Sequence, residues 1–223
     1  MKTKIFLLAL ILAVTVTAQA QSEFSFGIRA GVNFQNINGK DANGDQLEND
    51  LTTGFNVGVN MEIPVGTDIY FQPGLLFTTK GTKSTNEILT QQYDTKLSTS
   101  NIELPLNIVF KPLLGTGHML LGFGPYVAYG IGGKYKLQTN GTDLDWDVKF
   151  KKELTDAEVN DEVFYLKPFD AGANFLIGYE MANRLSLQLN AQLGLLNIHP
   201  DNPVDKDSIW KNTGFGLSLG YRF

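Results

Sequence analysis

The chain of 223 residues has 23 acidic and 18 basic residues, no cysteine, and a formal net charge of −5 at pH 7. The absence of cysteine excludes a disulfide framework and an anchor built on a lipid-modified cysteine. The acidic balance argues against a nucleic-acid partner, because sequence-independent binding to phosphates depends on a basic surface.

The first twenty residues have the three parts of a secretory signal peptide. Lys2 and Lys4 precede an apolar run over residues 5–14, and the triplet Ala18-Gln19-Ala20 follows as a cleavage site with small residues. The run is shorter than the roughly 20 apolar residues that a spanning helix requires. The sequence therefore predicts a cleaved signal peptide over residues 1–20 and a single mature domain over residues 21–223.

From residue 24 onward, apolar side chains alternate with small or polar ones. In the stretch FSFGIRAGVNF, residues 24–34, the even positions are all apolar and the odd positions are Ser, Gly, Arg, Gly and Asn. A period of two is typical of β-strands with two different faces. The pattern recurs along the chain and predicts eight strands, over residues 24–34, 55–63, 69–77, 102–110, 121–131, 169–179, 185–195 and 215–223.

The connections between these strands alternate between short and long. The short ones cover residues 64–67, 111–117 and 181–183, whereas the long, polar ones cover residues 36–51, 81–98, 132–163 and 197–211. In an up-and-down barrel, this order places all four long loops at one rim and both termini with the short turns at the other. A soluble sandwich gives no reason for such sorting.

The residue types on the two faces of the strands indicate whether each face meets lipid, water or the barrel interior. The non-apolar side is rich in Gly, Ser, Asn and Gln, which suits a crowded lumen better than an oily core or a solvated surface. Eight strands enclose a space just wide enough for side chains to fill. The apolar side then faces outward, where only lipid stabilises it. The predicted fold is all-β, an eight-stranded antiparallel up-and-down transmembrane β-barrel.

Aromatic residues are expected to form two rings, as in the interfacial girdles of membrane barrels. The ring at the long-loop rim contains Phe34, Phe55, Phe77, Tyr129, Phe169 and Phe215, and the ring at the short-turn rim contains Phe24, Phe71, Phe110, Tyr179, Tyr221 and Phe223. Pro73 and Pro105 lie inside predicted strands and predict bulges or local gaps, because each removes a ladder donor.

Three segments resemble the small PorT-like outer-membrane β-barrel family: NIELPLNIVFKP, GFGPYVAYGIGGKY and FDAGANFLIGYEM. The terminal FGLSLGYRF, with Tyr221 and Phe223, is similar to the last-strand signal that the barrel assembly machinery recognises. The resemblance implies location in the cell outer membrane, with outer-membrane lipid and the assembly machinery as partners. One branch of the family is tied to protein secretion across the outer membrane.

Charged residues on the lumen side form the candidate site. They are Arg29, Glu62, Glu103, Asp170, Glu180 and Arg222, with Lys80 and Lys134 near the loop rim. Buried charges without partners cost several kcal/mol, so we expect a paired structural network, with a narrow ion path as the alternative. Arg29 and Arg222 are expected to neutralise Glu62 and Glu180.

The loops offer no clear chemistry. Asp41, Asn43 and Asp45 place oxygen ligands on alternate residues, but Gln46 and Thr52 stand where a calcium loop of the EF-hand type needs Gly and Glu. The only histidines, His118 and His199, lie in no recognised catalytic pattern, and Ser208 is the one loop hydroxyl close in sequence to His199. The sequence therefore predicts no catalytic residue, no cofactor and no metal site.

The connection over residues 132–163 is long and heavily charged, and it predicts either a binding loop or a charged cap over the rim. Within it, residues 152–162 predict a short helix with Thr155 as cap and Glu158 three residues later. We expect a non-enzymatic outer-membrane protein with an envelope-structural or recognition role through four extracellular loops, and residues 132–163 as the partner-binding segment. The alternative is an accessory role in protein secretion or narrow-channel transport.

Overall fold

The computed structural model describes residues 24–223 except 89–90, 140–141, 157, 159–162 and 206. The predicted signal peptide over residues 1–20 lies outside these ranges. In the described part of the chain, no helix is both long and apolar enough to cross a membrane.

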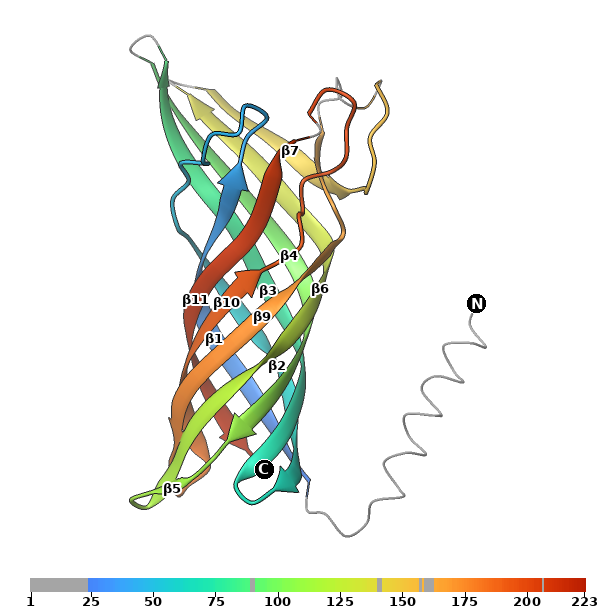
Figure 1. Cartoon of the computed structure of the whole chain (residues 1–223). Coiled ribbons are helices and arrows are strands. Elements are labelled where there is room, and N and C mark those ends of the chain that lie inside the picture. Colours follow the sequence, from blue (N-terminus) through green and yellow to red (C-terminus); the bar gives the residue numbers. More distant parts are fainter. Residues whose placement is uncertain (1–23, 89–90, 140–141, 157, 159–162, 206) are drawn as a thin grey trace.

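Eight strands pair side by side into a closed antiparallel ring (Figure 1). Each strand pairs with the next, and β4 pairs directly with β6 because β5 is a short branch. The ring consists of β1 (Ser25–Lys40), β2 (Thr52–Gly66), β3 (Ile69–Ile88), β4 (Gln91–Phe110), β6 (Gly117–Thr139), β9 (Phe169–Glu180), β10 (Leu185–Gly194) and β11 (Ile209–Arg222). The predicted eight-stranded barrel is confirmed.

Three further strands lie outside the ring. β5 (Leu113–Leu114) pairs with the start of β6. β7 (Thr142–Phe150) continues antiparallel from β6, and β8 (Phe164–Leu166) pairs in parallel with the end of β7. β5 lies at the end of the barrel with the short connections, here called the turn end, and β7 and β8 lie at the opposite end, here called the loop end (Figure 1).

The first and last strands close the ring. Fourteen residue pairs join β1 to β11, from Gly27 opposite Arg222 to Lys40 opposite Ile209. Closure pairs the backbone groups of both edge strands, as a membrane-spanning sheet requires. The C-terminus therefore lies at the turn end (Figure 1).

The apolar side of the strands faces outward. On β1, the side chains of Phe26, Ile28 and Val32 are about half exposed, whereas Asn33 retains only 4% of its exposed area. The same contrast holds around the ring, for example between Phe123 at 62% and Tyr126 at 1% on β6. The outer surface is therefore an apolar belt, and the polar side chains fill the lumen.

All four predicted long loops have incorrect boundaries, and the second and third differ most from the prediction. β3 and β4 run through most of residues 81–98 as a paired hairpin, with Gly81 opposite Ser98. β6 likewise continues to Thr139 and turns back as β7, inside the expected loop over residues 132–163. Beyond Phe77 the outward positions of β3 become polar, so the strand continues without the apolar alternation that identified it.

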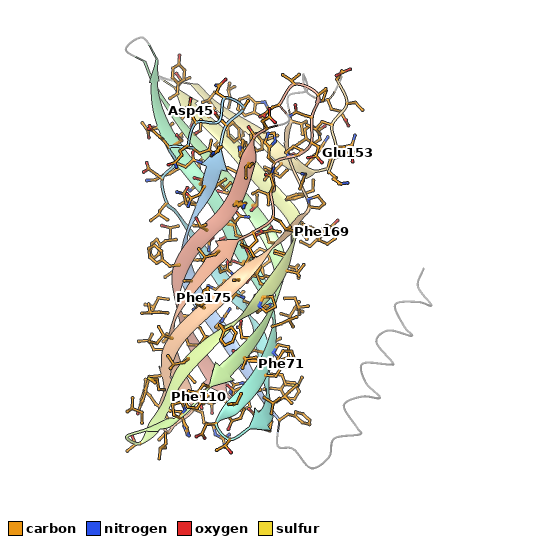
Figure 2. The ribbon with its side chains drawn as sticks, viewed as in Figure 1. Asp45, Phe71, Phe110, Glu153, Phe169 and Phe175 are labelled. Atoms are coloured by element: carbon orange, nitrogen blue, oxygen red, sulfur yellow. The ribbon has the colours of Figure 1, made fainter. Side chains whose placement is uncertain are left out.

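The aromatic ring at the loop-end rim consists of three contacting pairs. Phe34 contacts Phe215, Phe55 contacts Phe77, and Tyr129 contacts Phe169, with ring centroids between 5.1 and 5.7 Å apart. Figure 2 shows Phe71 and Phe110 near the turn end and Phe169 nearer the loop end, as two separate levels require.

Pro73 and Pro105 interrupt the ladders without shifting them. Pairing between β2 and β3 skips Pro73, from Asn60 opposite Gly74 to Ile63 opposite Phe71, and pairing between β3 and β4 skips Pro105, from Pro73 opposite Leu106 to Leu76 opposite Glu103. These are the gaps that a missing N–H predicts. The register shifts lie elsewhere, near Pro64 and between residues 100 and 101.

Candidate functional site

A cluster of four charges fills the lumen at the turn end. The Lys111 Nζ lies 2.8 Å from Glu62 Oε2 and 3.0 Å from Glu180 Oε1. Arg222 donates to Glu62 and lies 3.8 Å from Glu180. All four residues are buried, and they come from four separate segments of the ring. We call them the lower cluster.

Arg222, Glu62 and Glu180 were expected to meet, but Lys111 was missed because it was assigned to a short turn. Lys111 continues the lumen-facing parity of Glu103 and Asn107 on β4, so the alternation extended by one step would have found it. The expected pairing of Arg29 with these carboxylates is wrong. Arg29 lies higher in the lumen and donates to Asn190 Oδ1 at 3.4 Å, because residue 29 is several residues farther along β1 from the turn end.

The middle of the lumen is packed rather than open. Val109, Leu120 and Leu176 form a buried apolar layer directly above the lower cluster. Next along the axis, Arg29 lines a cavity of only about 30 Å³ together with neutral amides and Glu103. A space of this size holds one or two water molecules, which is too little for a continuous aqueous path.

A second charged cluster closes the lumen nearer the loop end. The Lys80 Nζ lies 3.0 Å from Glu103 Oε2 and 3.1 Å from Asp170 Oδ2. Tyr126 donates its hydroxyl to Asp170 at 3.1 Å, and its ring lies 4.3 Å from the Lys80 ammonium. Asn212 adds a third donor to Asp170. We call this group the upper cluster.

Lys134 does not join the lumen, contrary to expectation. Its side chain is 59% exposed and lies 3.9 Å from Asp145. The register shift between residues 100 and 101 inverts the parity of β6, so Gly133 and Tyr135 face inward and Lys134 faces outward. A one-residue change in phase moves every following side chain to the other face.

Charge in the lumen is balanced. The four cations are Arg29, Lys80, Lys111 and Arg222, and the four carboxylates are Glu62, Glu103, Asp170 and Glu180. The sum of the four positive and four negative charges is zero. The two clusters therefore lock the interior and leave no excess of one sign to attract ions.

The loop end has a small hydrophobic core of its own. Five buried residues from five segments meet there: Ile37, Leu97, Val148, Leu166 and Ile198. Phe150 closes over the barrel wall at Gly130, where a Cβ atom would lie 2.2 Å from the Phe150 ring. The segment over residues 132–163 is thus packed into the barrel mouth where the structure describes it.

Aromatic side chains stack beside this core. Phe164 stacks on Tyr135 with ring centroids 4.5 Å apart and on Trp210 at 6.0 Å. Tyr135 also contacts Trp146 at 5.8 Å, and His199 meets Trp210 edge to face at 4.7 Å. Sequence reasoning missed this group because its members lie on five separate segments.

Ion pairs lie on the outer side of the loop end. Glu158 accepts from Lys151 at 2.6 Å and from the backbone and hydroxyl of Thr155. The Lys151 and Thr155 hydrogen bonds lower the pKa of Glu158 to about 2. The predicted capping contact is therefore present, although much of the predicted helix lies outside the described residues. Asp45 and Glu153 lie at the same end (Figure 2).

His199 is buried with an acidic neighbour but without a nucleophile. Its Nε2 lies 3.3 Å from Asp205 Oδ2. Ser208 donates its hydroxyl to the same carboxylate at 2.7 Å, so the serine bonds to the acid and not to the imidazole. His118 lies at the turn end beside β5.

The acidic turn at residues 41–45 is organised by its own backbone. Asp41 Oδ1 accepts from the N–H groups of Asn43 and Asp45. Across the described ranges, no three His, Asp or Glu side chains are grouped to hold a metal ion.

Comparison with known families decides the class of protein. Residues 18–199 match the family described as outer membrane protein beta-barrel domain. The matched residues make up more than half of the chain. The chain belongs to this family. This outer-membrane barrel therefore resides in the outer membrane, and its apolar belt faces lipid. The match shows this family, and membership of the PorT-like group stays a prediction.

Solved structures of similar topology include Ail, the attachment invasion locus protein of Yersinia pestis, at 14% identity and a TM-score of 0.37, and Neisserial surface protein A at 10% and 0.45. Each alignment covers 90% of this chain and 99% of the other. The translocator domain of the autotransporter NalP from Neisseria meningitidis is 8% identical with a TM-score of 0.36, covering 100% and 97%. No curated protein matches the chain. No shared function follows from these similarities.

The C-terminal residues of this outer-membrane barrel lie on its outer face at the turn end. Tyr221 and Phe223 contact each other edge to face at 5.2 Å and are 39% and 61% exposed. Their recognition by the assembly machinery stays a prediction.

Replacing a lumen lysine should strongly destabilise the barrel. Lys80→Met leaves Glu103 and Asp170 buried without their cation, and we expect a loss of about 3–5 kcal/mol in the free energy of unfolding. Urea unfolding in detergent micelles, followed by tryptophan fluorescence, measures this change. Lys111→Met should act similarly through Glu62 and Glu180.

The matched control is Lys136→Met, because Lys136 is 48% exposed and pairs with Asp145 at the surface. It should change stability by less than about 1 kcal/mol. Adding Asp170→Asn to Lys80→Met should recover part of the loss. An unfolding midpoint for Lys80→Met equal to that of the control would show that the upper cluster contributes nothing.

The folded arrangement of the loop end should become less stable as the pH falls. Burial lowers the pKa of His199 below its ordinary value of 6.5, and Asp205 only partly opposes this. The neutral imidazole therefore stabilises the fold above the unfolded pKa, and this contribution is lost as the pH falls through the lower folded pKa. Histidine NMR titration in micelles, together with the rate of tryptic cleavage at the loop end, measures the effect.

His118→Gln leaves a single histidine and makes the signal unambiguous, while His199→Gln should remove the pH dependence of cleavage. A titration midpoint for His199 at or above 6.5 would contradict this account.

Proposed function

We propose that this outer-membrane barrel is a non-enzymatic recognition protein whose loop end lies outside the cell and carries the binding surface. The lumen offers no room for cargo, because the two charged clusters and the apolar layer between them fill it. Contact with a partner then falls to the ends of the barrel. The loop end is the larger and more varied of the two.

The observation that carries this proposal is the hydrophobic core at the loop end. Buried side chains from five segments hold the connections in one arrangement. A surface that is ordered before binding loses less conformational entropy when a partner arrives. A connection that served only to join strands would need no such core. The segment over residues 132–163 contributes Val148 and Phe150 to this arrangement and remains the proposed partner-binding segment.

The side chains near His199 support the non-enzymatic assignment. A serine nucleophile needs a base within hydrogen-bond reach of its hydroxyl. Ser208 instead donates to Asp205 and is only 3% exposed. An incoming substrate would therefore meet neither the hydroxyl nor an activated oxygen.

Cysteine labelling in intact cells tests the orientation. Because the chain has no cysteine, Asp143→Cys at the loop end and Thr67→Cys at the turn end each supply a single reactive thiol. Asp143→Cys should react with a polymer-linked maleimide that is too large to pass porins. Thr67→Cys should react only after the outer membrane is permeabilised. The reverse pattern would overturn the proposed function.

A second candidate is an accessory role in secretion or narrow-channel transport, which the PorT-like resemblance of the three quoted segments favours. Planar-bilayer recording separates a channel from a closed barrel. We expect no stable conductance for the purified protein, because the charges within each lumen cluster pair with one another and the central cavity is about 30 Å³. Lys80→Ala, which removes the bridging cation, is the matched variant. A residual current that passes through the lumen should differ between this variant and the unaltered chain. Steady conductance of the unaltered chain would favour the second candidate. Co-purification of the chain with a secretion complex would favour it as well.

A further inference from the structure

A cavity of about 430 Å³ lies at the loop end between the barrel wall and residues 41–49. We call it the loop-end cup. Its volume falls within the range of roughly 300–1,000 Å³ that is typical of small-molecule sites. Part of its lining is aromatic, formed by Tyr135, Phe164 and Trp210 and here called the aromatic wall, and Ile37, Leu47 and Leu97 add aliphatic surface. Another part, here called the polar wall, is formed mainly by Asp41, Gln46, Glu48, Asn49, Thr82 and Thr95.

The charges of the cup exclude an anionic ligand. Among the described residues that line it, Asp41 and Glu48 are acidic and none is Lys or Arg. A phosphate, sulfate or carboxylate entering the cup would meet repulsion from two carboxylates without a compensating cation.

The aromatic wall does not favour a cation. A cation gains most when it lies over the face of an aromatic ring. Here the rings turn their faces to one another, since Phe164 stacks on both Tyr135 and Trp210. The two outer rings have further partners, since Trp146 contacts Tyr135 and His199 contacts Trp210. The wall therefore provides apolar contact and leaves little open ring face for a cation.

The polar wall is held in place before a ligand arrives. Ser84 donates to the backbone carbonyl of Glu48 at 3.1 Å, and Thr82 donates to that of Asp50 at 3.1 Å. Asn49 donates to the carbonyl of Ile37 at 2.8 Å. These bonds hold residues 48–50 against β1 and β3. Binding a ligand therefore costs little further conformational entropy at these residues.

We infer that the loop-end cup binds an uncharged saccharide. Hydroxyl groups of a sugar can donate to Glu48 and Asp41 and can exchange hydrogen bonds with the amides of Gln46 and Asn49. The apolar patches of the sugar ring can lie against the aromatic wall. This inference rests on the proposed recognition function and names the ligand class of the same surface.

Direct binding to the purified full chain in detergent tests the inference. The probes are cellotriose, maltotriose, mannotriose and chitotriose, each titrated at low and at high salt. Calorimetry measures the affinity, and tryptophan fluorescence reports the cup because Trp210 lines it. At least one probe should bind, with an affinity that salt leaves unchanged, because the ligand carries no charge.

Two exposed residues of the cup supply the variants. Gln46→Ala and Glu48→Gln should each weaken binding by about tenfold or more, as expected for loss of a direct hydrogen bond to the ligand. Their exposure leaves folding intact. The matched control is Glu153→Gln, which changes a 71% exposed carboxylate at the same end but outside the cup.

Binding of none of the four probes would overturn the inference, as would binding that survives both cup variants. Binding of pentalysine instead, weakened by salt, would assign the cup to a cationic partner. Each of these results leaves the labelling of Asp143→Cys unaffected, so failure of the saccharide inference is distinguishable from failure of the proposed function.

Discussion

Four cations and four carboxylates share the interior of a ring that is too narrow for bulk solvent, and the fold depends on their mutual neutralisation. Each charge alone would cost several kcal/mol at such depth. The lower cluster joins β2 and β9 through Lys111, and Arg222 adds β11 through the same two carboxylates. The upper cluster joins β3, β4 and β9 through Lys80. Strands on opposite sides of the barrel are therefore connected directly through the lumen, and not only through their neighbours in the sheet.

The proposed recognition function belongs to the ends of the barrel. The body of the barrel is apolar outside, and paired charges fill much of its interior. The loop end combines a small hydrophobic core, stacked aromatic rings and a polar cavity. Family membership accounts for the body and is silent about this end. Its chemistry therefore has to be argued from its own residues.

Most of the ring could be predicted from the sequence, because lipid outside and a crowded lumen inside impose strict alternation on every spanning strand. The halves of β3, β4 and β6 nearer the loop end could not be predicted, because water and not lipid surrounds them. Polar residues such as Lys83 and Lys136 are stable on their outer face, so apolar and polar positions no longer alternate there. Lys134 was misplaced for a related reason, since Ile131 is an extra residue in its own strand and changes the phase just beyond the last apolar outward position. Three of the lumen charges, Arg222, Glu62 and Glu180, were predicted together, whereas Lys111 and the true neighbours of Arg29 depend on how far each strand extends toward the turn end.

The seam between β1 and β11 links the earliest and latest described parts of the chain. Arg222, one residue before the terminal Phe223, supplies half of the positive charge that surrounds Glu62 and Glu180. A polypeptide lacking its last few residues thus has both an open edge and a surplus carboxylate in its interior. Premature termination of translation therefore destabilises the product through an unneutralised buried charge as well as through unpaired backbone groups. Such a product is poorly suited to enter a bilayer.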